Sequence, residues 1–252
     1  MQFCKERPLE NMKQSLSVGW LYPDLMSTYG DRGNIFCLTK RCQWRGIEVL
    51  VKNLSPDSSI KDFTACDIIV GGGSQDRQQG IVITDLLKRK KELAAMFRDG
   101  KVGLFVCGSP QLLGHYYETA DKKKLPGLGI FDMVTHSGFG KPRLIGNLVA
   151  KTDLGIIVGF ENHSGRTYLG NVKPFGKVIS GFGNNGEDKT EGAVYNNCLA
   201  TYSHGPLLPK NPNIADWLIA KALEIKYHKT VPLEKLDDTT EEHAHKYIIE
   251  NR

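Results

Sequence analysis

Short apolar runs alternate with longer amphipathic stretches in the first half of the chain. The apolar runs are residues 15–21, 47–51, 66–70 and 102–106. Runs of this length without polar alternation are typical of strands buried on both faces of a parallel sheet. The stretches at about 34–45 and 81–98 have helical periodicity and end at Gly46 and Gly100, and glycine commonly follows the last turn of a helix. This pattern predicts an α/β fold with a mainly parallel sheet flanked by helices.

The second half of the chain has a different texture. From about Gly127, short β-branched segments are separated by Gly, Asn, Asp and Pro, and the strands expected there are 130–135, 144–150, 156–160, 178–180 and 193–202. They predict a β-rich second half that either extends the parallel sheet or forms a small antiparallel one.

The two ends of the chain are expected to lie outside the main domain. A loose tail is predicted over 1–14, one domain over 15–227 with a last amphipathic helix at about 214–226, and a polar tail over 228–252. Within that tail, Thr239 and Glu242 have capping-box spacing, which predicts a short terminal helix over about 244–249.

Composition excludes several classes of protein. With 40% hydrophobic and 24% charged residues, the chain is typical of a globular protein and not of a disordered or fibrous one. No apolar run approaches the ~18 residues of a membrane-spanning helix, and the charged start gives no signal peptide, so we expect a cytoplasmic protein that is not integral to the membrane. The net charge of +5 is too diffuse to predict nucleic-acid binding. The basic clusters 88–91 and 122–124 are interpreted as solvated surface, with weak contact to an anionic ligand or membrane as the alternative.

The cysteines do not predict a disulfide framework or a zinc site. The chain has six, none in a C-x-x-C pair: Cys4, Cys37, Cys42, Cys66, Cys107 and Cys198. Most are interpreted as small core residues in a reducing compartment. No metal or cofactor is expected in this chain.

Cys107 has the sequence context of a nucleophile. It follows the apolar run 102–106 and precedes a small-residue turn, Gly108 to Pro110, and a stretch over 111–117 that is expected to be helical. A strand, a sharp turn and a helix form a nucleophile elbow, in which the helix N-terminus favours a thiolate and the Gly108 amide faces an oxyanion. Glycines usually stand two residues before and after such a nucleophile, but here Phe105 and Ser109 do. A buried structural cysteine remains the alternative.

His204 is the natural candidate for the base. It follows the strand expected over 193–202 and precedes Gly205-Pro206, so it should lie at the same sheet edge as Cys107. A loop histidine without a role is the alternative, and three other histidines compete for the role: His115, His136 and His163.

A run of three glycines, Gly71 to Gly73, ends another predicted strand. It predicts either a tight turn or a loop whose backbone, at Gly73, supplies a second oxyanion donor. It is not a phosphate-binding P-loop, because the G-K-[ST] that completes that motif is missing.

Six motifs in the same order make the chain resemble the class I, triad-type, glutamine amidotransferases, in the branch related to cobyric acid synthase. The motifs are TYGDRGN (28–34), GGGSQD (71–76), VCGSPQLLG (106–114), RLIGN (143–147), GFENHSGRTYLG (159–170) and YSHGPLLPKNP (202–212). The resemblance runs from about Ser17 to Tyr227. It implies a flavodoxin-like α/β fold in which a cysteine attacks the side-chain amide of L-glutamine through a thioester.

The resemblance also implies roles for individual residues. Cys107 matches the nucleophile and His204 its base, and Arg143 falls near the arginine that holds the α-carboxylate of glutamine. Gly73, Gly108 and Gln111 complete the implied substrate-binding set. Two further residues, Glu161 and His163, match a signature that shapes the site without being the catalytic pair.

A partner protein is implied as well. In the part of this branch that the chain resembles, the ammonia is used by a MurT-like synthetase of the Mur-ligase family, which amidates the D-glutamate of lipid II. ATP and Mg²⁺ are then expected on the partner, and the chain is expected at the inner face of the membrane only through that partner and lipid II. Two other functions stay open: a cysteine hydrolase or peptidase on the same elbow, and a catalytically silent subunit, against which the intact Cys107 and His204 argue.

The third member of a catalytic triad is missing from its usual place. Triad-type amidotransferases usually carry a glutamate two residues after the catalytic histidine, and that position here is Pro206. The nearest downstream carboxylate is Asp216. We therefore expect a triad that is incomplete in this chain, completed either by Glu161 folding back to His204 or, preferably, by a carboxylate from the partner.

Overall fold

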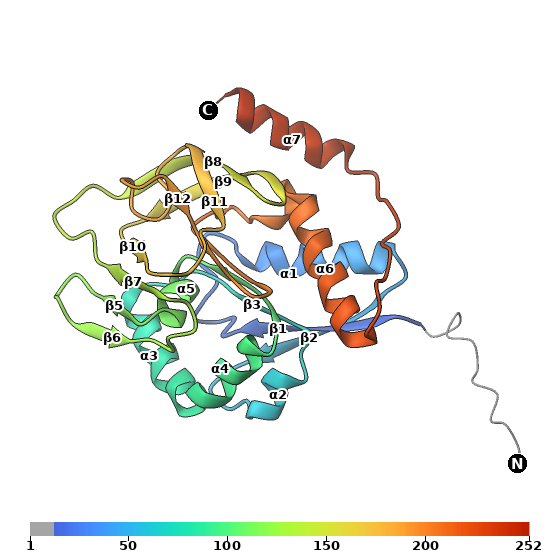
Figure 1. The fold of residues 1–252 in the computed structure, drawn as a ribbon, viewed down its shortest axis with the longest axis horizontal. Helices are drawn as coiled ribbons and strands as arrows, with labels where there is room; N and C mark the ends of the chain where they lie inside the picture. The colour runs from blue at the N-terminus through green and yellow to red at the C-terminus, as the bar shows by residue number, and fades with distance from the viewer. Residues whose placement is uncertain (1–12, 252) are drawn as a thin grey trace, which may run out of the picture.

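The structure is a computed structural model that describes residues 13–251 (Figure 1). The tail expected over 1–14 therefore lies outside the described residues, apart from its last two. The central sheet and the helices comprise β1 (Ser15–Leu21), α1 (Arg32–Trp44), β2 (Glu48–Leu54), α2 (Ile60–Thr64), β3 (Ile68–Gly71), α3 (Asp76–Leu86), α4 (Lys90–Arg98), β4 (Val102–Val106), α5 (Gly108–Leu113), β13 (Ala193–Tyr195), β14 (Cys198–Thr201), α6 (Pro212–Tyr227) and α7 (Thr239–Glu250).

The central sheet has the strand order β13-β14-β4-β3-β1-β2, and all of its pairs are parallel except β13 with β14. The predicted α/β fold with a mainly parallel sheet is confirmed. Because the strands run in one direction, their carboxyl ends lie at one edge: Gly71 of β3 pairs with Phe105 of β4, and Thr201 of β14 pairs with Val106. The loops after β3, β4 and β14 therefore meet.

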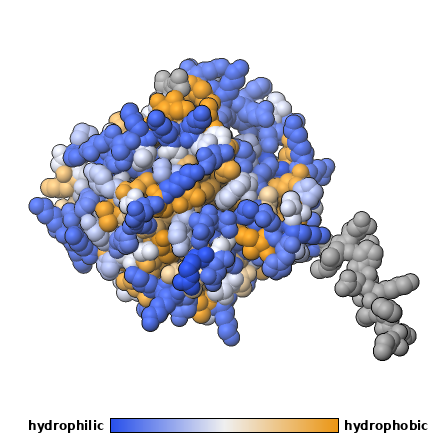
Figure 2. Space-filling view, in the orientation of Figure 1, coloured by the Kyte–Doolittle hydropathy of each residue, from blue (hydrophilic) through white to orange (hydrophobic). Residues whose placement is uncertain are grey.

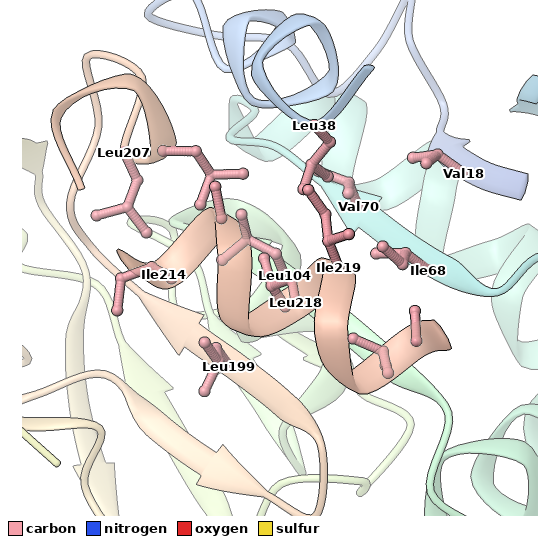
Figure 3. Packing of buried hydrophobic residues seen from close by; sticks show 14 of the residues in the cluster. Val18, Leu38, Ile68, Val70, Leu104, Leu199, Leu207, Ile214, Leu218 and Ile219 are labelled. Carbon is pink, nitrogen blue, oxygen red and sulfur yellow. The ribbon is translucent and has the colours of Figure 1, made fainter. Parts of the chain in front are cut away.

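Both faces of this sheet are apolar, since successive strand residues point to opposite sides. Ile68 and Val70 of β3 pack in the core beneath α1 and α6, whereas Ile69 packs with α3 and α4. Figure 3 shows Leu218 of α6 and Leu38 of α1 lying against the sheet on the first of these faces. Burial on both sides explains why these strands read as continuous apolar runs.

The β-rich second half forms two further sheets and also extends the central one. The remaining strands are β5 (Tyr116–Glu118), β6 (Lys124–Pro126), β7 (Met133–His136), β8 (Leu144–Thr152), β9 (Gly155–His163), β10 (Arg166–Leu169), β11 (Gly176–Ser180) and β12 (Thr190–Glu191). They pair in the orders β10-β7-β5-β6 and β12-β11-β8-β9, while β13 and β14 join the central sheet. The β-rich character is thus confirmed, but both topological alternatives occur together. The strands β6, β10 and β12 were not predicted, and the single strand predicted over 193–202 is the antiparallel pair β13 and β14.

Two predicted helices are shorter than expected. The stretch predicted as one helix over 81–98 begins at Asp76 and is divided into α3 and α4 by a 3₁₀ turn over Leu87–Arg89. Arg89 leaves helical geometry there, and its side chain donates hydrogen bonds to the carbonyl oxygens of Pro56 and Ser58. The helix expected over 111–117 ends at Leu113, and Tyr116 begins β5.

The C-terminal segment is polar but contacts the rest of the fold. Val231 packs into the core beside α6, and Nδ1 of His245 in α7 donates to the carbonyl oxygen of Lys210 at 2.8 Å. The expected terminal helix is present, although Asp238 and not Thr239 is the residue at its N-cap.

The surface mixes polar and apolar side chains, and Figure 2 shows several separate apolar patches among hydrophilic ones on one face. Exposed large apolar side chains include Phe36, Trp44 and Phe139. Over residues 13–251, no helix is both long enough and apolar enough to cross a membrane.

Candidate functional site

A pocket of about 450 Å³ opens at the carboxyl edge of the central sheet. Its lining includes Tyr29, Ser74, Asp76, Gln79, Cys107, Gln111, Arg143, Asn162 and His163. These residues come from the loops after β1, β3 and β4, from the helices α3 and α5 that follow two of these loops, from the residue before β8 and from the end of β9. In a parallel α/β sheet this edge is where ligands bind.

Cys107 stands on a strained turn between β4 and α5. Its backbone has φ 55° and ψ −94°, a region that residues with a side chain rarely adopt, and strain of this kind clusters at functional sites. Its N–H donates to the carbonyl oxygen of Thr201 at 2.8 Å, and the Ser109 hydroxyl bonds to both backbone groups of Val106. The predicted elbow is present, and its thiol is 9% exposed at the pocket wall.

His204 is fully buried and lies beside Cys107. Backbone hydrogen bonds in both directions join it to Phe160 of β9, and the ring of Tyr29 meets it edge-on at 5.0 Å. Both His204 and Cys107 flank Gly73: a Cβ atom there would lie 3.0 Å from His204 Cε1 and 3.4 Å from Cys107 Cβ. The predicted pair is therefore brought together.

A carboxylate that the sequence analysis missed contacts this imidazole. Oδ1 of Asp31 lies 3.0 Å from Nδ1 of His204, and Asp31 is 3% exposed. Burial disfavours the charged imidazole, but its interactions with Cys107 and the Asp31 hydrogen bond outweigh this effect and raise the pKa of His204 above its ordinary value. The sequence predicts Glu161 or, preferably, a carboxylate of the partner as the missing acid. The carboxylate that contacts His204 in this structure is instead Asp31, which the turn before α1 carries to it.

Gly73 does not offer a free oxyanion donor in this structure. Its N–H donates to Oδ2 of the same Asp31 at 2.7 Å. The absence of a side chain at Gly73 nevertheless matters, since it leaves room for His204. Gly108 follows Cys107 at the start of α5, and a Cβ atom there would lie 2.8 Å from the Ser74 nitrogen, so glycine is required at this position too.

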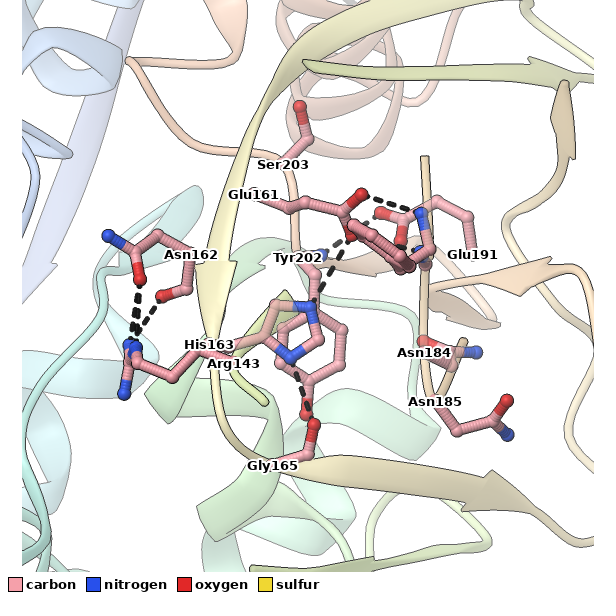
Figure 4. A network of polar contacts seen from close by, with 12 residues as sticks. Arg143, Glu161, Asn162, His163, Gly165, Asn184, Asn185, Glu191, Tyr202 and Ser203 are labelled. Carbon is pink, nitrogen blue, oxygen red and sulfur yellow. Dashed lines mark hydrogen bonds and ion pairs between the residues drawn. The ribbon is translucent and has the colours of Figure 1, made fainter. Parts of the chain in front are cut away.

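Glu161, the other candidate for the missing acid, is engaged elsewhere. Its carboxylate accepts the backbone N–H groups of Phe182 and Gly183 at 2.6 and 2.9 Å, and it lies 3.5 Å from Nε2 of His163 (Figure 4). The His163 ring stacks on Tyr202 and donates from Nδ1 to a backbone carbonyl oxygen. Burial lowers the pKa of His163, although the neighbouring Glu161 carboxylate opposes this effect, and the residue belongs to a buried polar network beside the pocket.

The remaining histidines are excluded as bases by position. His115 pairs with Asp132 and His136 lies near Glu118, whereas the histidine beside Cys107 at Gly73 is His204.

Arg143 and Gln111, two of the predicted substrate-binding residues, both line the pocket. Arg143 is exposed, and its Nε and Nη2 donate to Asn162 at 2.9–3.0 Å, which fixes the guanidinium (Figure 4). Gln111 is buried, accepts from Gln79 at 2.8 Å and donates to the Tyr202 hydroxyl at 3.1 Å. Its amide is therefore used to hold the pocket wall in place.

Asp76 was also missed by the sequence analysis. It is the one carboxylate among the described lining residues, and Tyr117 donates to its Oδ1 at 2.9 Å. Its place at the end of the GGGSQD motif was the available signal. Within residues 13–251, no three His, Cys, Asp or Glu side chains gather as a metal site would require.

Comparison with known proteins places these features in context. The family profile of the CobB/CobQ-like glutamine amidotransferase domain matches residues 17–212. The chain is 42% identical over 238 residues to the lipid II isoglutaminyl synthase (glutamine-hydrolyzing) subunit GatD of Staphylococcus aureus (strain N315), which covers 93% of this chain and 95% of that protein. It is 38% identical over 231 residues to the subunit of the same name from Streptococcus pneumoniae (strain ATCC BAA-255 / R6), covering 90% and 88% of the two chains.

A solved structure shares the fold. A crystal structure of a glutamine amidotransferase superposes with a TM-score of 0.57 at 16% identity, over 81% of this chain and 98% of that one.

Proposed function

This chain belongs to the CobB/CobQ-like glutamine amidotransferase family, and we propose that it is the glutamine-hydrolysing subunit of a lipid II isoglutaminyl synthase. The observation that carries this proposal is the strained Cys107 beside His204 in a pocket that also holds Arg143. The similarity to two GatD subunits over about nine tenths of the chain supports the choice of complex.

The chemistry follows from the positions of these residues. The Cys107 thiolate attacks the side-chain amide carbon of L-glutamine, and the N–H of Gly108 stabilises the oxyanion. The His204 imidazolium gives its proton to the departing nitrogen, so the C–N bond breaks, ammonia leaves and a γ-glutamyl thioester remains. Water then adds to the thioester as neutral His204 takes a proton from it, the S–C bond breaks, and glutamate leaves, so that the Cys107 thiolate and the His204 imidazolium are restored.

Opposite charges in the pocket fit the two charged groups on the α-carbon of a free amino acid. Arg143, fixed by Asn162, binds the α-carboxylate, because its guanidinium fork matches a carboxylate. Asp76, on the same lining, binds the α-ammonium group. A peptide substrate lacks one or both of these charges, which favours glutamine over the peptidase alternative.

The ammonia passes to a second protein. We assign ATP and Mg²⁺ to a MurT-like synthetase of the Mur-ligase family, which amidates the D-glutamate of lipid II, and we place the complex in the cytoplasm at the inner face of the membrane. The pocket described here takes part only in the release of ammonia.

The test is a glutaminase assay of the purified chain, alone and with the Mur-ligase-like protein from the same source. We expect glutamate release by the chain, and ATP-dependent amidation of lipid II by the pair with glutamine as nitrogen donor. Absence of glutamate release in both arms, or cleavage of peptides in place of glutamine, would refute the proposal.

A further inference from the structure

We propose that Asp31 orients His204, so that the triad Cys107–His204–Asp31 is complete within this chain. This inference rests on the proposed glutaminase function and concerns how the base is held. Asp31 is a positioning residue, because it contacts the imidazole and not the substrate.

The contact between Asp31 and the His204 imidazole has the geometry expected of a carboxylate that orients a catalytic histidine. Oδ1 of Asp31 lies 3.0 Å from Nδ1 of His204, and both side chains are shielded from water. A carboxylate only accepts here, so Nδ1 carries the proton and Nε2 is left for Cys107. Among the described residues, His204 Nε2 has no hydrogen-bond partner, as expected for the nitrogen that exchanges a proton with the thiol during the reaction.

The second oxygen of Asp31 joins the base to the glycine turn. Oδ2 accepts the N–H of Gly73 at 2.7 Å, and the carbonyl oxygen of Gly73 accepts the N–H of Thr28 at 3.1 Å. The carboxylate is thus held at both oxygens, which limits its rotation and fixes the plane in which it meets His204.

The rest of the TYGDRGN segment packs against the loop that follows His204. A Cβ atom at Gly33 would lie 2.4 Å from Pro206 Cγ, and Oδ1 of Asn34 accepts the N–H of Leu208 at 2.9 Å. These contacts, independent of Asp31 itself, hold the start of α1 against the His204 loop. The motif therefore has a physical purpose, which is to bring a carboxylate from 173 positions away to the imidazole.

The alternative sources of a carboxylate are disfavoured by the same geometry. Both Glu161 oxygens are taken by backbone N–H groups. A partner's carboxylate would have to displace Asp31 from a fully buried histidine. The charged or titratable groups around His204 are Asp31, Cys107, Tyr29 and, through its electrostatic influence, His163.

The test compares Asp31→Asn with the wild-type chain in a glutaminase assay. We expect kcat to fall by about 10²- to 10⁴-fold, as when a triad aspartate is replaced in a serine protease, with KM changed less than about threefold. Asp85→Asn is the matched control, because Asp85 is an equally buried carboxylate bound by Tyr22 and Arg89. It should keep kcat within about threefold at a temperature where both variants are folded.

A second readout separates orientation from simple structural support. Without Asp31 the thiolate–imidazolium pair is less stable, so alkylation of Cys107 by iodoacetamide should slow at neutral pH and its pH midpoint should move upward. Should Asp31→Asn not fold, a pH titration of the wild-type chain followed by ¹⁵N-histidine NMR gives the answer. As the His204 imidazolium loses its proton, Nδ1 is expected to stay protonated and Nε2 to lose its proton. A neutral His204 that keeps its proton on Nε2 instead overturns the proposal.

The outcomes distinguish this inference from the proposed function. A wild-type chain that hydrolyses no glutamine, alone or with its partner, refutes the function. A glutaminase whose Asp31→Asn variant keeps kcat and the alkylation profile refutes the role of Asp31. Restoration of the variant's kcat by the Mur-ligase-like protein would show that the partner supplies the acid.

Discussion

At the residue scale, backbone strain and chemistry coincide at Cys107. Its positive φ costs on the order of 1–3 kcal/mol, which a residue without Cβ avoids. We expect Cys107→Ala to remain folded and to lose at least ~10³-fold in glutamine hydrolysis. Cys107→Gly should be equally inactive but no less stable than Cys107→Ala, despite the usual entropic penalty of glycine. Thermal unfolding and glutamate release measure both, and near wild-type activity in either variant would remove Cys107 from the mechanism.

Arg143 differs from Cys107 in the kind of loss it should cause. A carboxylate clamp binds ground state and transition state alike, so Arg143→Ala should raise the glutamine KM more than it lowers kcat. Lys141→Ala is the control, since Lys141 is a nearby exposed cation paired with Glu187 and lies outside the pocket lining. Initial rates over a range of glutamine concentrations decide the point, and a collapse of kcat at constant KM would place Arg143 in the chemistry.

The sequence predicted part of this site for a clear reason. Cys107 and His204 each follow an apolar run that forms a strand. Because these strands, β4 and β14, are parallel, the residues that follow each strand lie at the same edge of the sheet. Asp31 and Asp76 lie in polar turns where local patterning carries no information about distant contacts. Only the packing of Gly33 on Pro206 and of Asn34 on Leu208 shows where Asp31 must go.

At the element scale, helix boundaries depended on contacts that periodicity does not contain. The apolar spacing continues through Arg89, yet a 3₁₀ turn separates α3 from α4 where the Arg89 side chain bonds to the Pro56 and Ser58 carbonyl oxygens. The glycine stop after α1 was predicted correctly, because Gly46 adopts φ 69°, which glycine accommodates without strain.

The helices α1, α6 and α7 are joined by ion pairs around Arg41. This guanidinium is 2% exposed and makes hydrogen-bonded pairs with Asp216 of α6 and with Asp238 at the start of α7. Arg41→Ala removes the hydrogen bonds to both carboxylates, but both are partly exposed and Asp216 keeps Arg45, so the free energy of unfolding should fall by about 1–3 kcal/mol. Arg98→Ala, which breaks an exposed pair with Asp99, should change it by less than about 0.5 kcal/mol. Urea unfolding measures the difference, and equal effects would show that the Arg41 network adds no stability.

The same network sets a pH dependence. Burial disfavours the charged form of Asp216, but hydrogen bonds from Arg41 and Arg45 outweigh it and lower the pKa of Asp216 below its ordinary value. A lowered carboxylate pKa stabilises the fold above the unfolded-state pKa of ~3.9, and this stability is lost as the pH falls through the folded-state value. Wild-type stability should therefore decline more steeply in acid than that of Arg41→Ala.

At the scale of the whole molecule, layer order was predictable and strand pairing was not. Runs buried on both faces indicate a central parallel sheet, whereas the short strands after Gly127 carry no signal for their partners. The strands after Gly127 are distributed over three sheets. In the central sheet β14 pairs with β4, and in a second sheet β7 pairs with β5 and β10. The pairing of β14 with β4 is what brings His204 to Cys107.

The division of labour between two proteins yields the last prediction. If this chain only releases ammonia, the synthetase should not need Cys107 once ammonia is supplied from solution. The Cys107→Ala chain in complex with its Mur-ligase-like partner should therefore amidate lipid II with high ammonium chloride and ATP, at a rate within about threefold of the wild-type complex under the same conditions, and should fail with glutamine. The wild-type complex should use both nitrogen donors, and the partner alone should show whether the chain is needed for ammonia use. Because Cys107→Ala removes only a sulfur from a pocket wall, complex formation should be unchanged, as gel filtration of the mixture would show. Failure of ammonia to support amidation by an intact Cys107→Ala complex, while the wild-type complex uses it, would mean that the elbow also takes part in the synthetase reaction.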